Sequence, residues 1–262
     1  MVFIFILVAT AEDHLRITIA LSLSILLALI AFVLNWLTID GMTAATLFGV
    51  IAFGLGGIVG AAIVLTFFIS SSLLSKNLLN EESLQENKFR RDGEQVWSNG
   101  FWFALWVMLW FLTKQEAFLI AGVASMAAAT ADTWASEIGG HRVKGKTWLV
   151  PSFKTVRPGT DGGISVVGTF ASLVGAFFIG LIFWITYNEV TIFQFLLIAI
   201  SGIVGSLIDS LLGSKIQGSE LNEGFKKFFP KHTNKIGNNT VNWMASGSAS
   251  FVALIAVLFS GQ

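Results

Sequence analysis

The sequence predicts an all-α polytopic membrane protein that forms a single membrane domain over residues 1–262. Three observations predict it: the chain carries little charge, apolar runs long enough to cross a bilayer recur along it, and the basic residues gather in alternate links between those runs. Only 12% of the residues are charged and 54% are hydrophobic, whereas a soluble domain carries about 25% charged residues. The chain has no cysteine, which excludes disulfides and thiolate metal sites.

The apolar runs define about seven transmembrane helices, since a span needs about 17–25 predominantly apolar residues. The apolar start, residues 1–10, is shorter than that, so whether it enters the membrane stays open. Three links between runs are too short for anything but tight turns, so we expect three helical hairpins, joined by three long polar loops on the other side. The expected spans are Ile17–Thr38, Met42–Ile69, Val96–Leu112, Ala117–Trp134, Ile164–Thr186, Ile192–Leu212 and Trp243–Phe259, and the expected turns are Ile39–Gly41, Thr113–Glu116 and Tyr187–Thr191.

The basic residues are placed unevenly between the two sides of this topology. Of the 16 Lys and Arg residues, all except Lys114 lie on the side of the long loops, including Arg16 before the first span. Cytoplasmic loops of membrane proteins carry an excess of Lys and Arg. We therefore expect a multi-pass integral membrane protein whose long basic loops are cytoplasmic.

Two aspartates near the ends of apolar runs have matching surroundings. Asp132 follows the apolar run 117–131, and Asp209 lies near the end of the run that begins at Ile192. Both have small residues at positions −7, −4, −3, +1 and +4, which on a helix fall largely on one face. We expect these two helices to pack together with both acids facing one shared cytoplasmic cavity, within a parallel internal repeat of helices 3–4 and 5–6. The small residues are Ser125, Ala128, Ala129, Thr133 and Ser136 around Asp132, and Gly202, Gly205, Ser206, Ser210 and Gly213 around Asp209.

Carboxylates in membrane helices indicate a functional site. Each costs about 2.5–3.5 kcal/mol on insertion scales, so it normally faces a protein interior or an aqueous cavity. Clustered acids without cysteine suit a hard cation. We expect Mg²⁺, with Mn²⁺ as an alternative, to bind Asp132, Glu137 and Asp209. The structural alternative is that the acids reach the membrane interface.

The second long loop has the composition of an anion site. It combines basic side chains, hydroxyl groups and glycines whose backbone N–H groups can approach a ligand, and the N-terminus of the next helix points into the same place. A helix cap with positive-inside charge is the alternative, and the loop has no Walker motif. The candidate phosphate-binding residues are Lys154, Thr155, Arg157, Gly159, Thr160, Gly162 and Gly163, with Asp161 among the candidate catalytic acids.

Further polar residues stand where the loops enter the apolar helices. Amides and hydroxyls inside an apolar helix need hydrogen-bonding partners. We expect them to line the cytoplasmic mouth of the same cavity, with helix capping as the alternative for the amides. The candidates are Arg91, Asn99, Ser136, Ser210, Asn239 and Asn242.

Several of these strings together resemble the family of integral membrane proteins called domain of unknown function 92, which includes animal transmembrane protein 19 and the plant phytyl-phosphate kinase. The matching strings run in the expected order over residues 70–242, the family core that carries the expected active site. The chain departs from the family in the third long loop, where many relatives carry Cys and His and this chain is Lys-rich. The matching strings are Ser70–Lys76, Arg91–Gly100, Ala131–Gly139, Gly159–Ser165 with Gly168 and Thr169, Gly205–Gly213, and Asn238, Asn239, Val241 and Asn242.

The resemblance implies a Mg²⁺-dependent kinase that transfers a phosphoryl group from a nucleoside triphosphate, CTP, to a prenyl phosphate such as phytyl phosphate. In it Asp132 and Asp209 would hold the metal, with Glu137 or Asp161 completing its shell, and Lys154 and Arg157 would bind phosphate. The alternatives are a nucleotidyltransferase like the CDP-lipid synthases, and a secondary transporter, because repeated hairpins with intramembrane acids are typical of transporters. The expected partners are the nucleotide, the prenyl phosphate and membrane lipids. No nucleic acid is expected, and a homo-oligomer is left open.

Overall fold

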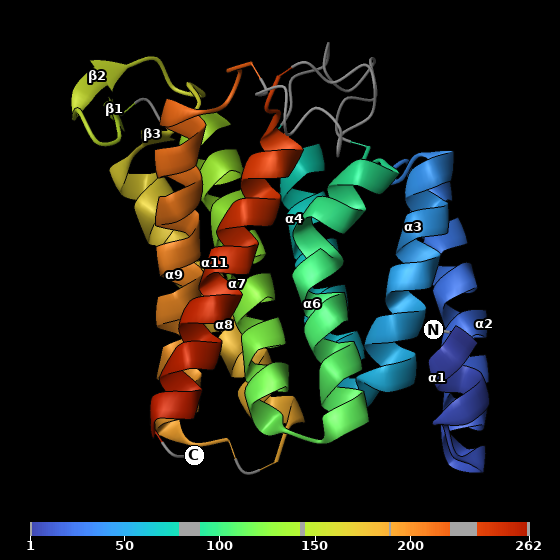
Figure 1. Ribbon diagram of the computed structural model, residues 1–262. Helices are drawn as coiled ribbons and strands as arrows, with labels where there is room; N and C mark the ends of the chain where they lie inside the picture. The colour runs from blue at the N-terminus through green and yellow to red at the C-terminus, as the bar shows by residue number, and fades with distance from the viewer. Residues whose placement is uncertain (1, 79–89, 142–144, 189, 221–234, 261–262) are drawn as a thin grey trace.

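The structure is a bundle of long helices with a small sheet at one end (Figure 1). It is a computed structural model that describes residues 2–78, 90–141, 145–188, 190–220 and 235–260. Within these residues seven helices are long and apolar enough to cross a membrane, which confirms the expected fold class. Most of the Lys-rich third loop, residues 221–234, lies outside the described residues. The seven helices are α2 (Ala11–Val33), α4 (Gly57–Leu78), α6 (Gly93–Thr113), α7 (Glu116–His141), α8 (Val166–Thr186), α9 (Ile192–Lys215) and α11 (Asn238–Ser260).

Local capping explains where several of these helices begin. Asp92 precedes α6 and forms a capping box with Gln95, and Thr191 precedes α9 and forms one with Gln194. The hydroxyl of Ser165 accepts from the N–H of Gly168 at the start of α8. Such caps satisfy N–H groups that a helix start leaves unpaired. They therefore hold the ends of three spans at defined residues.

The expected second span, Met42–Ile69, is wrong, because the chain reverses within it. The segment forms α3 (Ile39–Gly49), a π-helical turn η1 (Val50–Leu55) and then, after a break at Gly56 and Gly57, α4. Gly57 has φ +62°, a conformation that favours glycine. A Cβ atom on Gly60 would collide with the carbonyl oxygen of Ala52. These glycines thus build a reversal, whereas glycines in membrane spans commonly serve close helix packing.

The reversal places the link between α2 and α3 at the end of the bundle that carries the long loops. Leu37 pairs with Arg91 in an isolated β-bridge, and the N–H of Thr38 donates to the carbonyl of Arg91 at 3.0 Å. Arg16 lies at the other end, where its Nε donates to the carbonyl of Gly54 in η1 at 2.9 Å. Two expectations are therefore wrong: the turn expected at Ile39–Gly41 is the start of α3 at the long-loop end, and Arg16 lies at the opposite end. The short helix α1 (Val2–Leu7) packs beside α2 (Figure 1).

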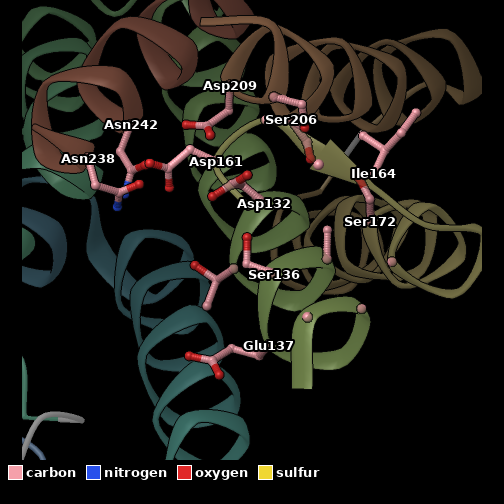
Figure 2. Close-up of a pocket in the computed structure, with 18 of the residues that line it drawn as sticks. Asp132, Ser136, Glu137, Asp161, Ile164, Ser172, Ser206, Asp209, Asn238 and Asn242 are labelled. Atoms are coloured by element: carbon pink, nitrogen blue, oxygen red, sulfur yellow. The ribbon is translucent and has the colours of Figure 1, made fainter. Parts of the chain in front are cut away.

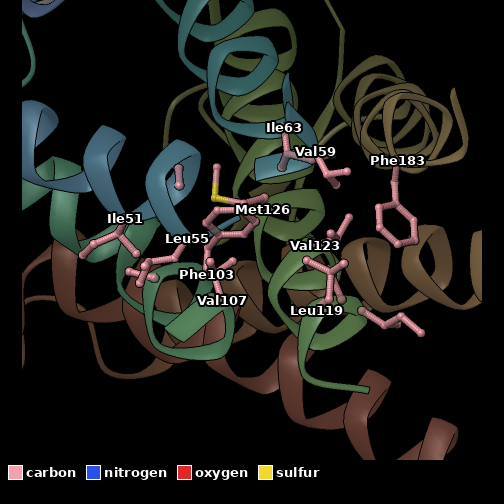
Figure 3. Packing of buried hydrophobic residues seen from close by; sticks show 14 of the residues in the cluster. Ile51, Leu55, Val59, Ile63, Phe103, Val107, Leu119, Val123, Met126 and Phe183 are labelled. Carbon is pink, nitrogen blue, oxygen red and sulfur yellow. The ribbon is translucent and has the colours of Figure 1, made fainter. Parts of the chain in front are cut away.

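The helix α7 forms the centre of the bundle. Of its apolar window 78% is buried, against 28–44% for the other six spans. Its neighbours come close because small residues meet: Cβ atoms on Gly202 and Gly205 of α9 would lie 2.8 and 2.5 Å from the Cβ atoms of Ala127 and Ala128. The expected packing of these two helices through small residues is thus confirmed. The large side chains fill the remaining space in an apolar core that includes Phe103, Val107, Leu119, Val123 and Met126 (Figure 3).

The second long loop contains a three-stranded antiparallel sheet that the sequence did not indicate. The strands are β1 (Thr147–Leu149), β2 (Lys154–Val156) and β3 (Gly163–Ile164), in the order β2-β1-β3. Three residues or fewer per strand are too short for a periodic pattern. Gly162, with φ +72°, lies so close to Ser210 and Ser214 of α9 that a Cβ atom there would collide with both. The sheet thereby holds the Gly-rich segment against the end of α9.

Candidate functional site

A cavity of about 450 Å³ opens at the long-loop end, between α6, α7, α8, α9, α11 and the segment 159–165 (Figure 2). Most of the residues that line it are polar, and they come from all the family-like strings of the sequence. Of the candidate residues, those that line it are Arg91, Asn99, Asp132, Ser136, Glu137, Gly159, Thr160, Asp161, Gly162, Gly163, Asp209, Ser210, Asn239 and Asn242.

Asp132 and Asp209 face this cavity together, from adjacent helices (Figure 2). Their carboxyl groups are within direct interaction distance of each other. Asp209 is 9% exposed, and with its amide nitrogen oriented toward this acid Asn242 donates to Oδ2 at 3.0 Å. The expectation of one shared cavity is confirmed for these two acids. Like charges this close in a poorly solvated place repel each other unless a cation or a proton lies between them.

Asp161 adds a third acid to the same part of the cavity. It belongs to the Gly-rich segment, and its charge acts on Asp209. Figure 2 shows it between the acid pair and the amides of Asn238 and Asn242. Even so, within the described ranges no three His, Asp or Glu residues converge on a single metal position. The cavity therefore offers a pair of carboxylates rather than a complete protein cage.

Glu137 does not join the acid pair, so the expected three-residue metal set is not assembled. Its Oε1 accepts from Ser75 Oγ of α4 at 2.6 Å, and it lies farther along α7 than Asp132 (Figure 2). The reason is the five-residue spacing, which on an ideal helix separates the two side chains by about 140° and about 7.5 Å along the axis. Glu137 therefore faces α4 and Arg91 instead.

Arg91 brings positive charge to the cavity. It is half-buried, and its guanidinium group lies over the ring of Phe67 at 5.1 Å. Burial lowers the pKa of Arg91 to about 10, while the charge of Glu137 acts in the opposite direction. The residue remains protonated at neutral pH. Among the described residues, the structure records no hydrogen bond donated by this guanidinium group.

The other expected cations are not in the cavity. Lys154 and Thr155 lie on β2, the strand of the sheet farthest from β3, and Arg157 follows it; all three are exposed and none lines the cavity. This corrects the expected phosphate site. The sequence suggested a single loop in which every residue could reach the ligand, whereas the sheet turns β2 away from the cavity.

The Gly-rich half of the same loop keeps its expected place. The N–H groups of Thr160 and Gly163 are used within the loop, donating to the carbonyls of Arg157 and Thr160. For the N–H groups of Gly159, Asp161 and Gly162 the structure records no acceptor among the described residues. Because α8 begins just after this segment, the positive end of its dipole adds to the same position. What remains of the anion site is built from backbone rather than from side-chain charge.

Sequence reasoning missed several hydroxyl groups of the cavity. Ser75, Ser172 and Ser206 line it, although none of the three is among the candidate site residues that the sequence indicates. Only the packing of α7 against α4, α8 and α9 reveals which small residues face the cavity and which face a neighbouring helix.

Comparisons with known proteins match the chain to one family model and to several relatives. The family described as "Integral membrane protein DUF92" matches residues 22–250. The chain is 32% identical to an uncharacterized membrane protein of Methanocaldococcus jannaschii, MJ0933, over 79% of this chain and 86% of that one. It is 30% identical to Protein PGR of Arabidopsis thaliana, over 93% of this chain and 97% of that one. It is 26% identical to the Arabidopsis Protein VTE6, chloroplastic, over 85% of this chain and 66% of that one. No solved structure matches the chain.

Proposed function

The chain belongs to the DUF92 family of integral membrane proteins, and from this premise we propose that it is a membrane phosphotransferase which uses a nucleoside triphosphate, with CTP as the first candidate, to phosphorylate a prenyl phosphate. The family relationship supports a membrane enzyme, because one of the plant relatives, VTE6, is a phytyl-phosphate kinase. The observation that carries the proposal is the pairing of Asp132 and Asp209 in one cavity with the Gly-rich segment. Phosphoryl transfer depends mainly on positioning the reactants and on neutralising charge. The acid pair and the Gly-rich segment together supply groups for both.

The donor set fits a magnesium ion that is shared with the substrate. Mg²⁺ is usually bound by one or two carboxylates together with substrate phosphates and water, rather than by a full set of protein ligands. Asp132 and Asp209 would hold it, and Asp161, whose charge acts on Asp209, would add negative charge beside them. The ion would neutralise the two carboxylates and the donor phosphates.

The residues of the cavity divide the work between donor and acceptor. The N–H groups of Gly159, Asp161 and Gly162 bind the donor phosphates, and Arg91 binds the phosphate of the acceptor. An oxygen of that phosphate attacks the γ-phosphorus of the nucleotide, and the bond from the γ-phosphorus to the bridging oxygen breaks. The products are a prenyl diphosphate and a nucleoside diphosphate. No catalytic base is required, because a phosphate monoester with a second pKa of about 6 is already ionised at neutral pH.

Purified protein incubated with CTP, Mg²⁺ and phytyl phosphate is therefore expected to form CDP and phytyl diphosphate, resolved by chromatography with mass detection. A reaction without Mg²⁺ is the control. Release of pyrophosphate with formation of a CDP-lipid would replace the kinase by a nucleotidyltransferase, which needs the same acids. No turnover with any prenyl phosphate and any nucleoside triphosphate would contradict both.

The exposed cations of the small sheet give a second test of the cavity's composition. Replacing both Lys154 and Arg157 with Ala is expected to change the KM for the nucleotide by no more than about twofold, because exposed charges outside the cavity are screened by salt. The measurement is the initial rate against nucleotide concentration at physiological ionic strength. A rise in KM of tenfold or more would restore these two residues to the phosphate site.

A further inference from the structure

A second, apolar cavity adjoins the first one. It lies between α2, α3, α4 and α6, has a volume of about 90 Å³, and is lined mainly by hydrocarbon and aromatic side chains. We call it the apolar groove. The residues that matter below are Leu27, Ala45, Phe48, Val64, Phe67 and Phe68.

Arg91 and Gln95 line both the polar cavity and the apolar groove. The backbone of Arg91 is held by its bridge to Leu37, and its guanidinium group by the ring of Phe67. The positive charge therefore stands where the polar and the apolar space meet. An amphipathic anion placed there would have its charged group in the polar cavity and its apolar part in the groove.

The groove also reaches the outer surface of the bundle. Leu27 on α2 is 43% exposed, and Val64 and Phe68 on α4 are half-buried. Both α2 and α4 are long and apolar enough to cross a membrane, so this side faces the hydrocarbon of a bilayer. A lipid can enter the groove from the side without leaving the bilayer.

We propose that the apolar groove binds the hydrocarbon chain of the acceptor lipid, at the end next to its phosphate, while Arg91 binds the phosphate itself. This inference rests on the proposed function for the identity of the lipid as an isoprenoid phosphate. A cavity of about 90 Å³ holds only the first part of the chain, and the rest extends into the bilayer.

The groove selects the shape of the chain rather than its hydrophobicity. A chain that moves from a bilayer into an apolar groove gains no hydrophobic free energy, because lipid tails are as apolar as the groove. What it gains is close packing against fixed side chains such as Phe48 and Phe67, and many small dispersion contacts add up. A methyl-branched chain and a straight chain of equal length would therefore bind differently.

The test is photolabelling with a geranylgeranyl phosphate that carries a diazirine on its first isoprene unit, in detergent–lipid micelles without nucleotide. Label is expected on peptides from α2, α3 and α4 that line the groove, and excess unlabelled geranylgeranyl phosphate should remove it. Phosphatidylglycerol and straight-chain hexadecyl phosphate should remove it far less. Label spread over the lipid-facing surface, or removed equally by phosphatidylglycerol, would overturn the proposal in favour of ordinary lipid contact.

Two matched variants locate the chain. Leu27→Trp adds a bulky ring at the groove, and Leu23→Trp adds the same ring one turn away on the same helix, at a residue that is equally exposed, 43%, but does not line the groove. Groove labelling is expected to fall about tenfold in Leu27→Trp and to stay unchanged in Leu23→Trp. Equal labelling of the two variants would contradict the proposal.

The experiments distinguish a failure of the groove proposal from a failure of the proposed kinase activity. Because labelling needs no nucleotide, specific groove label without turnover would leave the groove intact and remove the proposed kinase. Turnover of geranylgeranyl phosphate with label outside the groove would support the kinase and overturn the groove proposal. Should Leu27→Trp not fold, the wild-type competition experiment alone decides.

Discussion

Replacing Asp209 with Asn is expected to lower kcat for phosphoryl transfer by about 10³-fold, in the range found when one group that stabilises transition-state charge is removed. The substitution keeps the shape of the side chain and an oxygen that can accept from Asn242, which donates to Asp209 at 3.0 Å. It removes one of the two charges that would hold the metal. The measurement is the single-turnover rate at saturating CTP and Mg²⁺, with Glu12→Gln, an exposed acid at the other end of the bundle, as control.

The same substitution is expected to stabilise the protein when Mg²⁺ and nucleotide are absent. Asp132 and Asp209 repel each other in a poorly solvated cavity, and neutralising one of them relieves this by on the order of 1 kcal/mol. Thermal unfolding in detergent measures it. A gain in Tm together with a loss of activity indicates a functional pair. A loss of both would mean that Asp209 supports the fold and would contradict the metal role.

Replacing Arg91 with Ala is expected to reduce kcat/KM for the acceptor by about 10²–10³-fold, because a charge-assisted contact to phosphate in a partly desolvated cavity is lost. The effect should appear mainly in the KM for the prenyl phosphate and little in the KM for the nucleotide. Arg91→Lys should recover part of the loss, since it keeps the charge without the planar, two-pronged geometry. Initial rates with each substrate varied in turn measure both.

Arg90 supplies a neighbouring control for Arg91. Its Nε donates to the carbonyl of Leu37 at 2.9 Å, and its guanidinium group lies over the ring of Phe32 at 5.1 Å; it does not line the cavity. Arg90→Ala is therefore expected to lower Tm while the KM for the acceptor stays within about twofold of wild type. If the two Ala variants raise that KM equally, the charge of the loop matters and the position of Arg91 does not.

The spans from α6 onward could be predicted because the local sequence determines where each helix begins and ends. Hydropathy locates each apolar run, and caps such as Asp92, Ser165 and Thr191 stand at the starts. The reversal at Gly56–Gly57 could not be predicted in the same way, because residues 50–60 are apolar throughout and no polar turn interrupts them. The signal was the clustering of glycines, which has a second explanation in helix packing.

The acid pair could be predicted because a small-residue stripe marks the face on which each acid lies. Glu137 and Arg157 illustrate the limit of such reasoning. Which of the two acids of α7 faces α9 and which faces α4 depends on how α7 is rotated against its neighbours. Whether Arg157 faces the cavity depends on strands of two or three residues. Arg90 and Arg91 are adjacent and of one type, and only the bridge between Leu37 and Arg91 decides which of them enters the cavity.

The break at Gly56–Gly57 adds one reversal of direction, so the chain passes between the two ends of the bundle an even rather than an odd number of times. With α3 and η1 counted as one shorter segment, the described helices run from one end of the bundle to the other an even number of times (Figure 1). The start of α2 and the end of α11 therefore lie on the same side, opposite the cavity. In a cell both would belong to one compartment, and the chemistry of the cavity would take place in the other.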